Sequence, residues 1–159
     1  MFIRWEKSYE TGHPLIDAEH RLLVMLFRKL DIAIKTQQPE SVLVRTVVEV
    51  KRFVEFHFVS EENLMLESGY PDVEEHRMRH LELSLELVAR IDKLCLHNEY
   101  PDELLDFLFR WLSRHISHED QQVARHLRAT EQRPVGEMIY AEYLGTAAPT
   151  EVPMKRMAD

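Results

Sequence analysis

Apolar residues recur at helical spacing through four long segments of the chain. In the first segment, Leu23, Leu26, Phe27 and Leu30 lie three or four residues apart, which places them on one face of a helix. The other three segments show the same kind of spacing, and each is long enough for many helical turns. The expected helices span about residues 15–36, 39–67, 73–96 and 102–128.

Short breaks separate these segments. Pro39 suits the first turn of the second helix, and Gly69 ends that helix. Because the connections are short, consecutive helices should be antiparallel. We therefore expect an all-α protein, an antiparallel up-down-up-down four-helix bundle preceded by an N-terminal arm. The expected domains are the bundle, residues 1–130, and a C-terminal tail, residues 131–159, which holds a short helix at about 135–144 and is a candidate linker.

Composition narrows the classes of protein that fit this pattern. The formal net charge of −8 argues against a nucleic-acid partner, since binding a phosphate backbone relies on clustered Lys and Arg. No apolar run approaches membrane-spanning length, so no membrane insertion is expected. The single cysteine, Cys95, cannot form an intrachain disulfide, and charges interrupt the start of the chain where a signal peptide would be apolar. These features favour a reducing, cytoplasmic location.

Several of the nine histidines are spaced as metal ligands. The second segment has a histidine and a glutamate four residues apart, and the third has two histidines at the same spacing, so each pair shares one helix face. The first and fourth segments each offer a further histidine. Imidazole suits iron, zinc, copper and nickel, and carboxylates can bridge two metals. The residues concerned are His20, His57, Glu61, His76, His80 and His115.

A ferritin-like di-iron site is the first alternative to consider for a helical bundle. Such sites use a Glu-x-x-His motif on each of two helices and single glutamates on the others. Here the motif occurs once, from Glu10 to His13, in the glycine-containing arm. The sequence therefore does not support the ferritin-like arrangement.

The order of several short motifs resembles the hemerythrin family, especially its bacterial members. The resemblance covers about residues 5–127, which is most of the chain. The pieces that carry it are Trp5, Gly12, Ile16–His20, His57–Glu62, Tyr70-Pro71, His76, His80, Trp111-Leu112, His115-Ile116 and Asp120.

The resemblance implies a non-haem di-iron centre with an oxo or hydroxo bridge. Carried over residue by residue, it assigns three imidazoles to one iron and two to the other, with two carboxylates bridging both. The second iron then lacks one ligand, and that vacancy is where dioxygen is expected to bind. The implied metal ligands are His76, His80 and His115 for the first iron, His20 and His57 for the second, and Glu61 and Asp120 as bridges.

One of these assignments departs from regular helix geometry. His115 and Asp120 are five residues apart, so on a regular α-helix their side chains point well away from each other. Spacing alone favours Glu119, which is four residues from His115. The family pattern favours Asp120, and we follow it. This choice predicts a local widening of the fourth helix or compensating rotamers there.

Residues next to the implied ligands raise further expectations. The family usually has glutamine where this chain has Glu19, which we expect to face solvent or pair with an arginine; the alternative is that Glu19 approaches the metals. Asp17 could orient an imidazole or cap the first helix. His118 is expected to lie on the surface or just outside the ligand set. The apolar residues expected to wall the open iron position are Leu23, Phe58, Leu112 and Ile116.

The expected function is reversible dioxygen binding for carriage, storage or delivery. No general base or nucleophile stands out among the wall residues, which favours a binding protein over an enzyme. Two alternatives stay open: a sensory module that signals oxygen or redox state to a partner or a fused output domain, and a di-iron oxidase or nitric-oxide-handling enzyme. A metal-free bundle leaves the histidine spacing unexplained. The sequence leaves the oligomeric state and any protein partner that receives oxygen or a signal undetermined.

Overall fold

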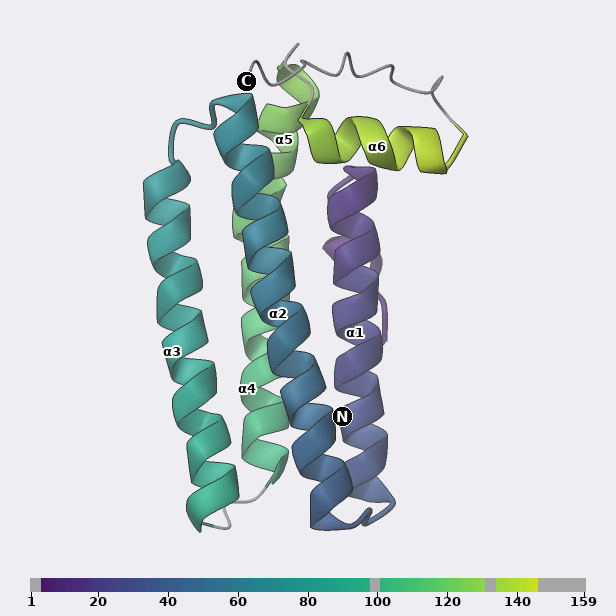
Figure 1. The fold of residues 1–159 in the computed structure, drawn as a ribbon, viewed down its shortest axis with the longest axis vertical. Coiled ribbons are helices and arrows are strands. Elements are labelled where there is room, and N and C mark those ends of the chain that lie inside the picture. Colours follow the sequence, from purple (N-terminus) through teal and green to yellow (C-terminus); the bar gives the residue numbers. More distant parts are fainter. Residues whose placement is uncertain (1–3, 98–100, 131–133, 146–159) are drawn as a thin grey trace, which may run out of the picture.

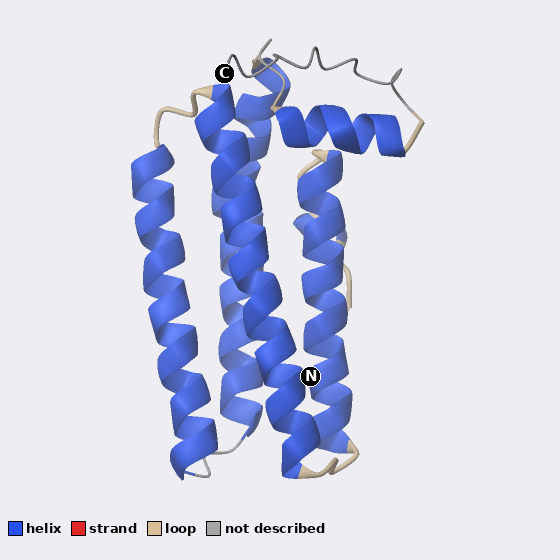
Figure 2. Ribbon diagram, in the orientation of Figure 1, coloured by secondary structure: helices blue, strands red, loops and turns tan. Residues whose placement is uncertain are grey.

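The four long helices lie side by side and run up and down the bundle (Figures 1 and 2). This computed structural model describes residues 4–97, 101–130 and 134–145, and within those ranges it contains helices and no strand. The all-α bundle predicted from the sequence is confirmed. The helices are η1 (Lys7–Tyr9), α1 (Pro14–Lys35), α2 (Glu40–Ser68), α3 (Val73–His97), α4 (Pro101–Arg114), η2 (His115–Asp120), α5 (Gln121–Ala129) and α6 (Val135–Tyr143).

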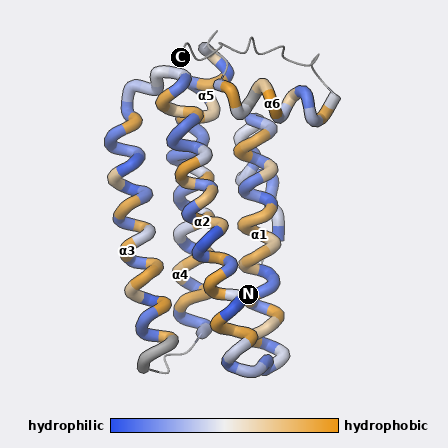
Figure 3. Tube along the Cα trace, viewed as in Figure 1, coloured by the Kyte–Doolittle hydropathy of each residue, from blue (hydrophilic) through white to orange (hydrophobic). Residues whose placement is uncertain are grey.

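Apolar and polar stretches alternate along the long helices (Figure 3), and apolar side chains of these helices form the buried core. The larger hydrophobic core is built around Phe27 of α1 and Leu108 of α4, and the smaller one around Ile16 of α1 and Met65 of α2. Along α1 the polar residue His20 falls between these two cores. The bundle therefore has a polar layer between two apolar ones, and this layer holds the candidate site. None of the described helices has the length and apolar character needed to cross a membrane.

The fourth long helix is interrupted by a π-helical turn. The sequence predicts one helix over residues 102–128, whereas the structure has α4, then the six-residue π turn η2, then α5. In a π turn the hydrogen bonds join residues five apart, so residues at that spacing lie nearly over one another. The widening expected between His115 and Asp120 is therefore confirmed, and the residues on both sides keep their faces towards the core.

The N-terminal arm is tied down beside the start of α1. Asp17 accepts hydrogen bonds from the backbone N–H of Thr11 at 2.7 Å, from the Thr11 hydroxyl at 2.7 Å and from the backbone N–H of Gly12 at 3.1 Å. Gly12 has a φ of +78°, a conformation that side chains disfavour. Asp17 thus holds the arm, and its hydrogen bonds go to backbone and hydroxyl groups rather than to an imidazole. This fixes the end of the helix that carries His20.

The short helix α6 crosses the end of the bundle (Figure 1). Its bounds match the expected helix at 135–144 to within one residue. The backbone N–H of Val135 donates to a Glu67 carboxylate oxygen at 2.6 Å, and Gly136 packs so closely that an added methyl group would lie 3.7 Å from Leu15 and 3.8 Å from Leu64. The tail helix therefore covers the bundle end beside the smaller core.

Removing the tail should leave the metal site in place. All the predicted ligands lie between His20 and Asp120, and α6 contributes packing and a hydrogen bond to Glu67 at the bundle end. We expect a chain ending at Ala129 to keep its iron content and visible spectrum while its melting temperature falls by a few degrees, because modest packing is lost. Metal analysis and thermal unfolding of both chains measure this. Loss of iron on truncation would contradict the division at residue 130.

Candidate metal centre

The seven predicted ligands meet in the interior of the bundle. They come from α1, α2, α3 and η2, and the side chains form two adjoining groups whose ligand atoms lie within 4.8 Å of one another in each group. None of the seven is more than 5% exposed. The first group is Glu61, His76, His80 and His115, and the second is His20, His57 and Asp120.

The first group gathers three imidazole nitrogens around one point. The Nε2 atom of His80 lies 3.0 Å from that of His76 and 3.1 Å from that of His115. Glu61 places Oε2 at 3.2 Å from His76 Nε2 and at 3.4 Å from His80 Nε2. The i, i+4 spacing of the two histidines on α3 explains why both reach the same point.

The second group is joined to the first by Asp120. Its Oδ2 atom lies 3.0 Å from His20 Nε2, while its Oδ1 atom lies 3.0 Å from His115 Nε2 in the first group. The rings of His20 and His57 pack edge to face, with centroids 4.9 Å apart. One carboxylate thus faces both groups, and the π turn is what brings it to this position.

The donor atoms fit metal ions better than they fit one another. Among the described residues, both nitrogens of His20, Nε2 of His57, Oε1 of Glu61 and both carboxylate oxygens of Asp120 are buried without an aligned hydrogen bond. Leaving such a group unpaired costs about 1–3 kcal/mol, so a cluster of them needs another partner. Two atoms that bind one ion at about 2.1 Å and at right angles lie about 3.0 Å apart, the spacing found here. Five imidazoles and two carboxylates suit iron.

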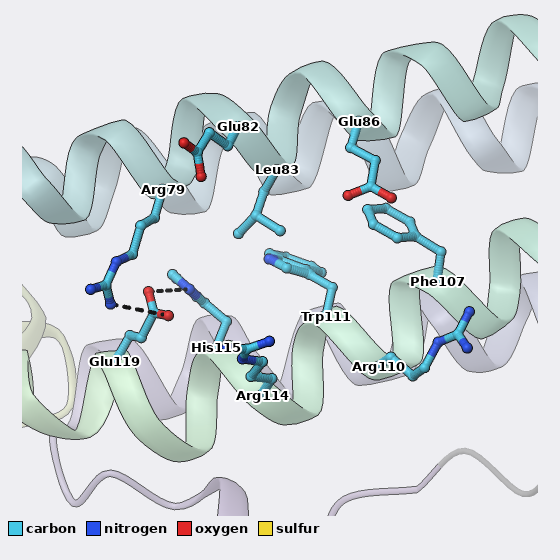
Figure 4. A pocket seen from close by; sticks show the side chains of 10 residues that line it. All are labelled: Arg79, Glu82, Leu83, Glu86, Phe107, Arg110, Trp111, Arg114, His115 and Glu119. Carbon is cyan, nitrogen blue, oxygen red and sulfur yellow. Dashed lines mark ion pairs between the residues drawn. The ribbon is translucent and has the colours of Figure 1, made fainter.

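Glu119 lies outside the cluster although its spacing favoured it. Its Oε2 atom faces the outer nitrogen of His115 at 3.2 Å, and its Oε1 atom pairs with Arg79 at 3.2 Å (Figure 4). His115, Glu119 and Arg79 line a surface pocket of about 580 Å³ between α3 and α4, together with Trp111. Glu119 therefore supports His115 from the solvent side, and Asp120 occupies the interior.

The expectation for Glu19 was wrong. We expected it to face solvent or an arginine, but it is 4% exposed and its Oε2 atom lies 2.8 Å from Nδ1 of His57. Its other oxygen accepts a hydrogen bond from the Ser60 hydroxyl at 2.6 Å. Position 19 faces α2 rather than solvent because α1 and α2 pack closely there. Glu19 contacts the outer nitrogen of His57 and is not a member of either ligand group.

Glu62 completes a set of three outer carboxylates. Its Oε1 atom lies 3.0 Å from Nδ1 of His80. Sequence reasoning missed this role, although Glu62 follows Glu61 directly and lies among the motif residues. When Nε2 of a histidine binds a metal, its Nδ1 atom carries the proton and donates it to such an acceptor, which orients the ring. Glu19 and Glu62 are placed to do this for His57 and His80. Glu119 lies 3.2 Å from Nδ1 of His115 as an ion pair without an aligned hydrogen bond.

The remaining sequence candidates are the four apolar residues and His118. Phe58 is buried and its ring stacks on that of His80, with centroids 3.8 Å apart. Leu23, Leu112 and Ile116 are each 1% exposed and belong to the same larger core as Phe58. His118 is exposed, and its Nδ1 atom lies 3.1 Å from the Arg114 carbonyl oxygen. The side chain of Cys95 lies outside the described residues.

Without metal, the cluster shifts the ionisation of its own members. Burial by itself would lower the pKa of His115, but the charge of Asp120 and the contacts with Asp120 and Glu119 outweigh it and raise that pKa to about 10. Burial acts to raise the pKa of Asp120, yet the charge of His115 lowers it well below its ordinary range. Burial and the charge of Asp120 act to raise the pKa of Glu61, and contacts with two imidazoles of its group lower it.

The stability of the iron-free protein should therefore fall as the pH rises. The proton on His115 stabilises the folded state because its pKa rises from 6.5 to about 10 on folding. That stabilisation is complete below pH 6.5 and disappears as the pH approaches 10. Glu119, with a pKa lowered to about 2, stays ionised throughout this window and does not contribute to the change. We expect the melting temperature of iron-free protein to decline across this range.

The control for this pH dependence is His115→Asn, because asparagine cannot bind the proton. Thermal unfolding of both iron-free proteins at a series of pH values measures the slope rather than the absolute stability. A flatter slope in the variant is expected. Equal slopes in the two proteins would show that another group controls the pH dependence.

Comparison with known proteins identifies the family of the chain. A model of the Hemerythrin HHE cation binding domain matches residues 11–127. The chain is similar to the bacteriohemerythrin of Stenotrophomonas maltophilia, 31% identical over 126 residues that cover 79% of this chain and 81% of the relative. It is also similar to the bacteriohemerythrins of Clostridium acetobutylicum, 29% identical with 77% and 98% covered, and of Pseudomonas aeruginosa, 28% identical with 73% and 75% covered. The chain belongs to the hemerythrin family, whose helical bundles bind iron without haem.

Proposed function

We propose that the protein binds dioxygen reversibly at a di-iron centre, for carriage, storage or delivery. The observation that carries this proposal is the unequal division of the ligands. Three imidazoles lie in the group with Glu61, whereas two lie in the group with Asp120. The first group would therefore surround an ion with more imidazoles than the second. The less complete position is the one open to a small ligand.

In this proposal each residue has a defined task. His76, His80 and His115 would hold one ion, His20 and His57 would hold the other, and Glu61 and Asp120 would contribute to both. Asp120 suits a bridge because its two oxygens face different groups, at 3.0 Å from His20 and from His115. A pair of iron ions supplies the two electrons on which reversible dioxygen binding depends.

The surroundings of the cluster support binding rather than turnover. Glu61, His20 and Asp120 are fully buried. The ring of Phe58, from the larger core, packs against the rings of His57, His80 and His115. Leu23, Phe58, Leu112 and Ile116 are the residues proposed to wall the open position. A dry apolar wall keeps water and protons away from a bound ligand, which is what reversible release needs.

The test is to reduce iron-loaded protein without oxygen and then admit oxygen while the visible spectrum is recorded. We expect a coloured form that returns to the colourless reduced form when oxygen is removed, over repeated cycles. A single colour change that oxygen removal does not reverse would contradict reversible binding. It would favour a sensory or oxidase role instead.

A further inference from the structure

Glu19 is a buried carboxylate without an arginine or lysine partner among the described residues. Its side chain is 6% exposed, and its contacts are the Nδ1 atom of His57 at 2.8 Å and the Ser60 hydroxyl at 2.6 Å. A neutral hydroxyl leaves the negative charge in place. The negative charge of Glu19 therefore lies beside Nδ1 of His57. The Nε2 atom of the same ring has no hydrogen-bond partner and belongs to the ligand group.

The other two outer carboxylates are neutralised. Glu62 pairs with Arg77 at 3.3 Å and is 20% exposed, and Glu119 pairs with Arg79 at 3.2 Å and is 17% exposed. A guanidinium group beside a carboxylate offsets its charge, and partial exposure to water screens what is left. Of the three, Glu19 is the one whose full charge is felt inside the bundle.

We propose that Glu19 is a positioning residue that acts through His57 to favour the oxidised state of the iron pair, an inference that rests on the proposed function. A carboxylate that accepts the Nδ1 proton makes the imidazole a more basic, more electron-donating ligand. Such a ligand stabilises the higher charge of ferric iron over ferrous iron. The position of Glu19 is thus a control on how readily the centre is oxidised.

Ser60 modulates this effect. Its hydroxyl donates to Glu19 Oε1 and so withdraws part of the negative charge from the oxygen that faces His57. Removing the hydroxyl leaves more negative charge on Oε2 of Glu19. The hydrogen bond that Oε2 accepts from Nδ1 of His57 then becomes stronger. The two residues therefore act on the iron pair with opposite signs.

The experiment is a redox titration of iron-loaded protein, following the visible spectrum, with iron content and circular dichroism measured in parallel. Glu19→Gln keeps an oxygen acceptor for His57 but removes the charge. At a fixed ambient potential, we expect this variant to lower the ratio of oxidised to reduced iron centre at least tenfold. For a one-electron couple a tenfold change corresponds to about 59 mV. Glu62→Gln and Glu119→Gln are the matched controls, and each should shift the ratio less than about threefold because arginine already offsets its charge.

Ser60→Ala provides the second test and does not depend on the stability of the glutamine variant. We expect it to shift the ratio towards the oxidised form, opposite to Glu19→Gln. A purely structural role for Glu19 would give both variants the same sign. The proposal is overturned if Ser60→Ala moves the ratio towards the reduced form or not at all, or if Glu19→Gln shifts it no more than the two controls do.

Failure of the proposed function would look different. A protein that holds two irons and shows these shifts, but does not release dioxygen reversibly, would contradict dioxygen carriage and leave the role of Glu19 intact. Reversible dioxygen binding with no dependence of the potential on residue 19 would contradict the role of Glu19 alone.

Discussion

Replacing Asp120 by alanine should cost the protein its bridged iron pair, whereas replacing Glu119 should leave the pair in place. The two side chains are neighbours in sequence, but the π turn directs only Asp120 into the cluster. Each of its oxygens lies 3.0 Å from an imidazole of a different group, so its loss removes a ligand from both ions. Glu119 contacts only the outer nitrogen of His115, at 3.2 Å, and its loss loosens one ring.

Iron analysis and the visible spectrum of the two alanine variants measure this difference. We expect Asp120→Ala to hold fewer than two irons and to lack the spectrum of a bridged pair. Glu119→Ala should keep both ions, with weaker retention of one, because partners of a ligand typically affect metal affinity by about 10–100-fold. The reverse result would show that regular i+4 geometry places Glu119 in the site.

Removing iron should lower the melting temperature by roughly 10 °C or more. A ligand that binds only the folded state at about 1,000 times its dissociation constant contributes about 4 kcal/mol. For a chain of this size each kcal/mol corresponds to about 2–4 °C. Metal binding also gives a partner to the buried nitrogen and oxygen atoms that otherwise have no aligned hydrogen bond, and so removes that energetic cost. Thermal unfolding before and after chelation measures the shift.

Two variants test whether the change in melting temperature on chelation comes from the predicted cluster. Glu61→Ala removes a fully buried member of the cluster and should abolish most of the shift. His118→Ala removes an exposed histidine that contacts only the Arg114 carbonyl among the described residues, and it should keep the shift intact. An equal shift in both variants would mean that iron stabilises the chain somewhere other than the predicted cluster.

The order of the helices and two i, i+4 pairs, His57 with Glu61 and His76 with His80, could be predicted from spacing along the chain. The full set of five imidazoles was implied by the family resemblance. Apolar residues three and four apart mark the buried face of a helix whatever packs against it, and a histidine pair such as His76 and His80 shares a face for the same reason. The breaks at Pro39 and Gly69 act locally, through the absence of an N–H group and through a positive φ, so they too are visible without tertiary information. The motif order then indicated which carboxylates belong with these imidazoles.

The choice between Glu119 and Asp120 depended on a feature that spacing does not reveal. A helix widens into a π turn when contacts elsewhere in the fold offset the cost of the irregular backbone. Here the turn allows Asp120 to face both groups of imidazoles. Regular periodicity describes the helix without that gain and therefore selects Glu119. The family pattern selected Asp120. Only the assembled bundle shows the π turn that brings its carboxylate between the two groups of imidazoles.

The outer carboxylates were decided by packing between helices. Glu19 follows the polar pattern of a solvent-facing residue, and the sequence contains no sign that α2 covers it. When α1 and α2 pack together, the same side chain is enclosed beside His57 and Ser60. Glu62 meets His80 across the α2–α3 interface in the same way. Contacts between residues that are far apart in sequence follow from how helix faces meet, which the periodicity of a single helix does not contain.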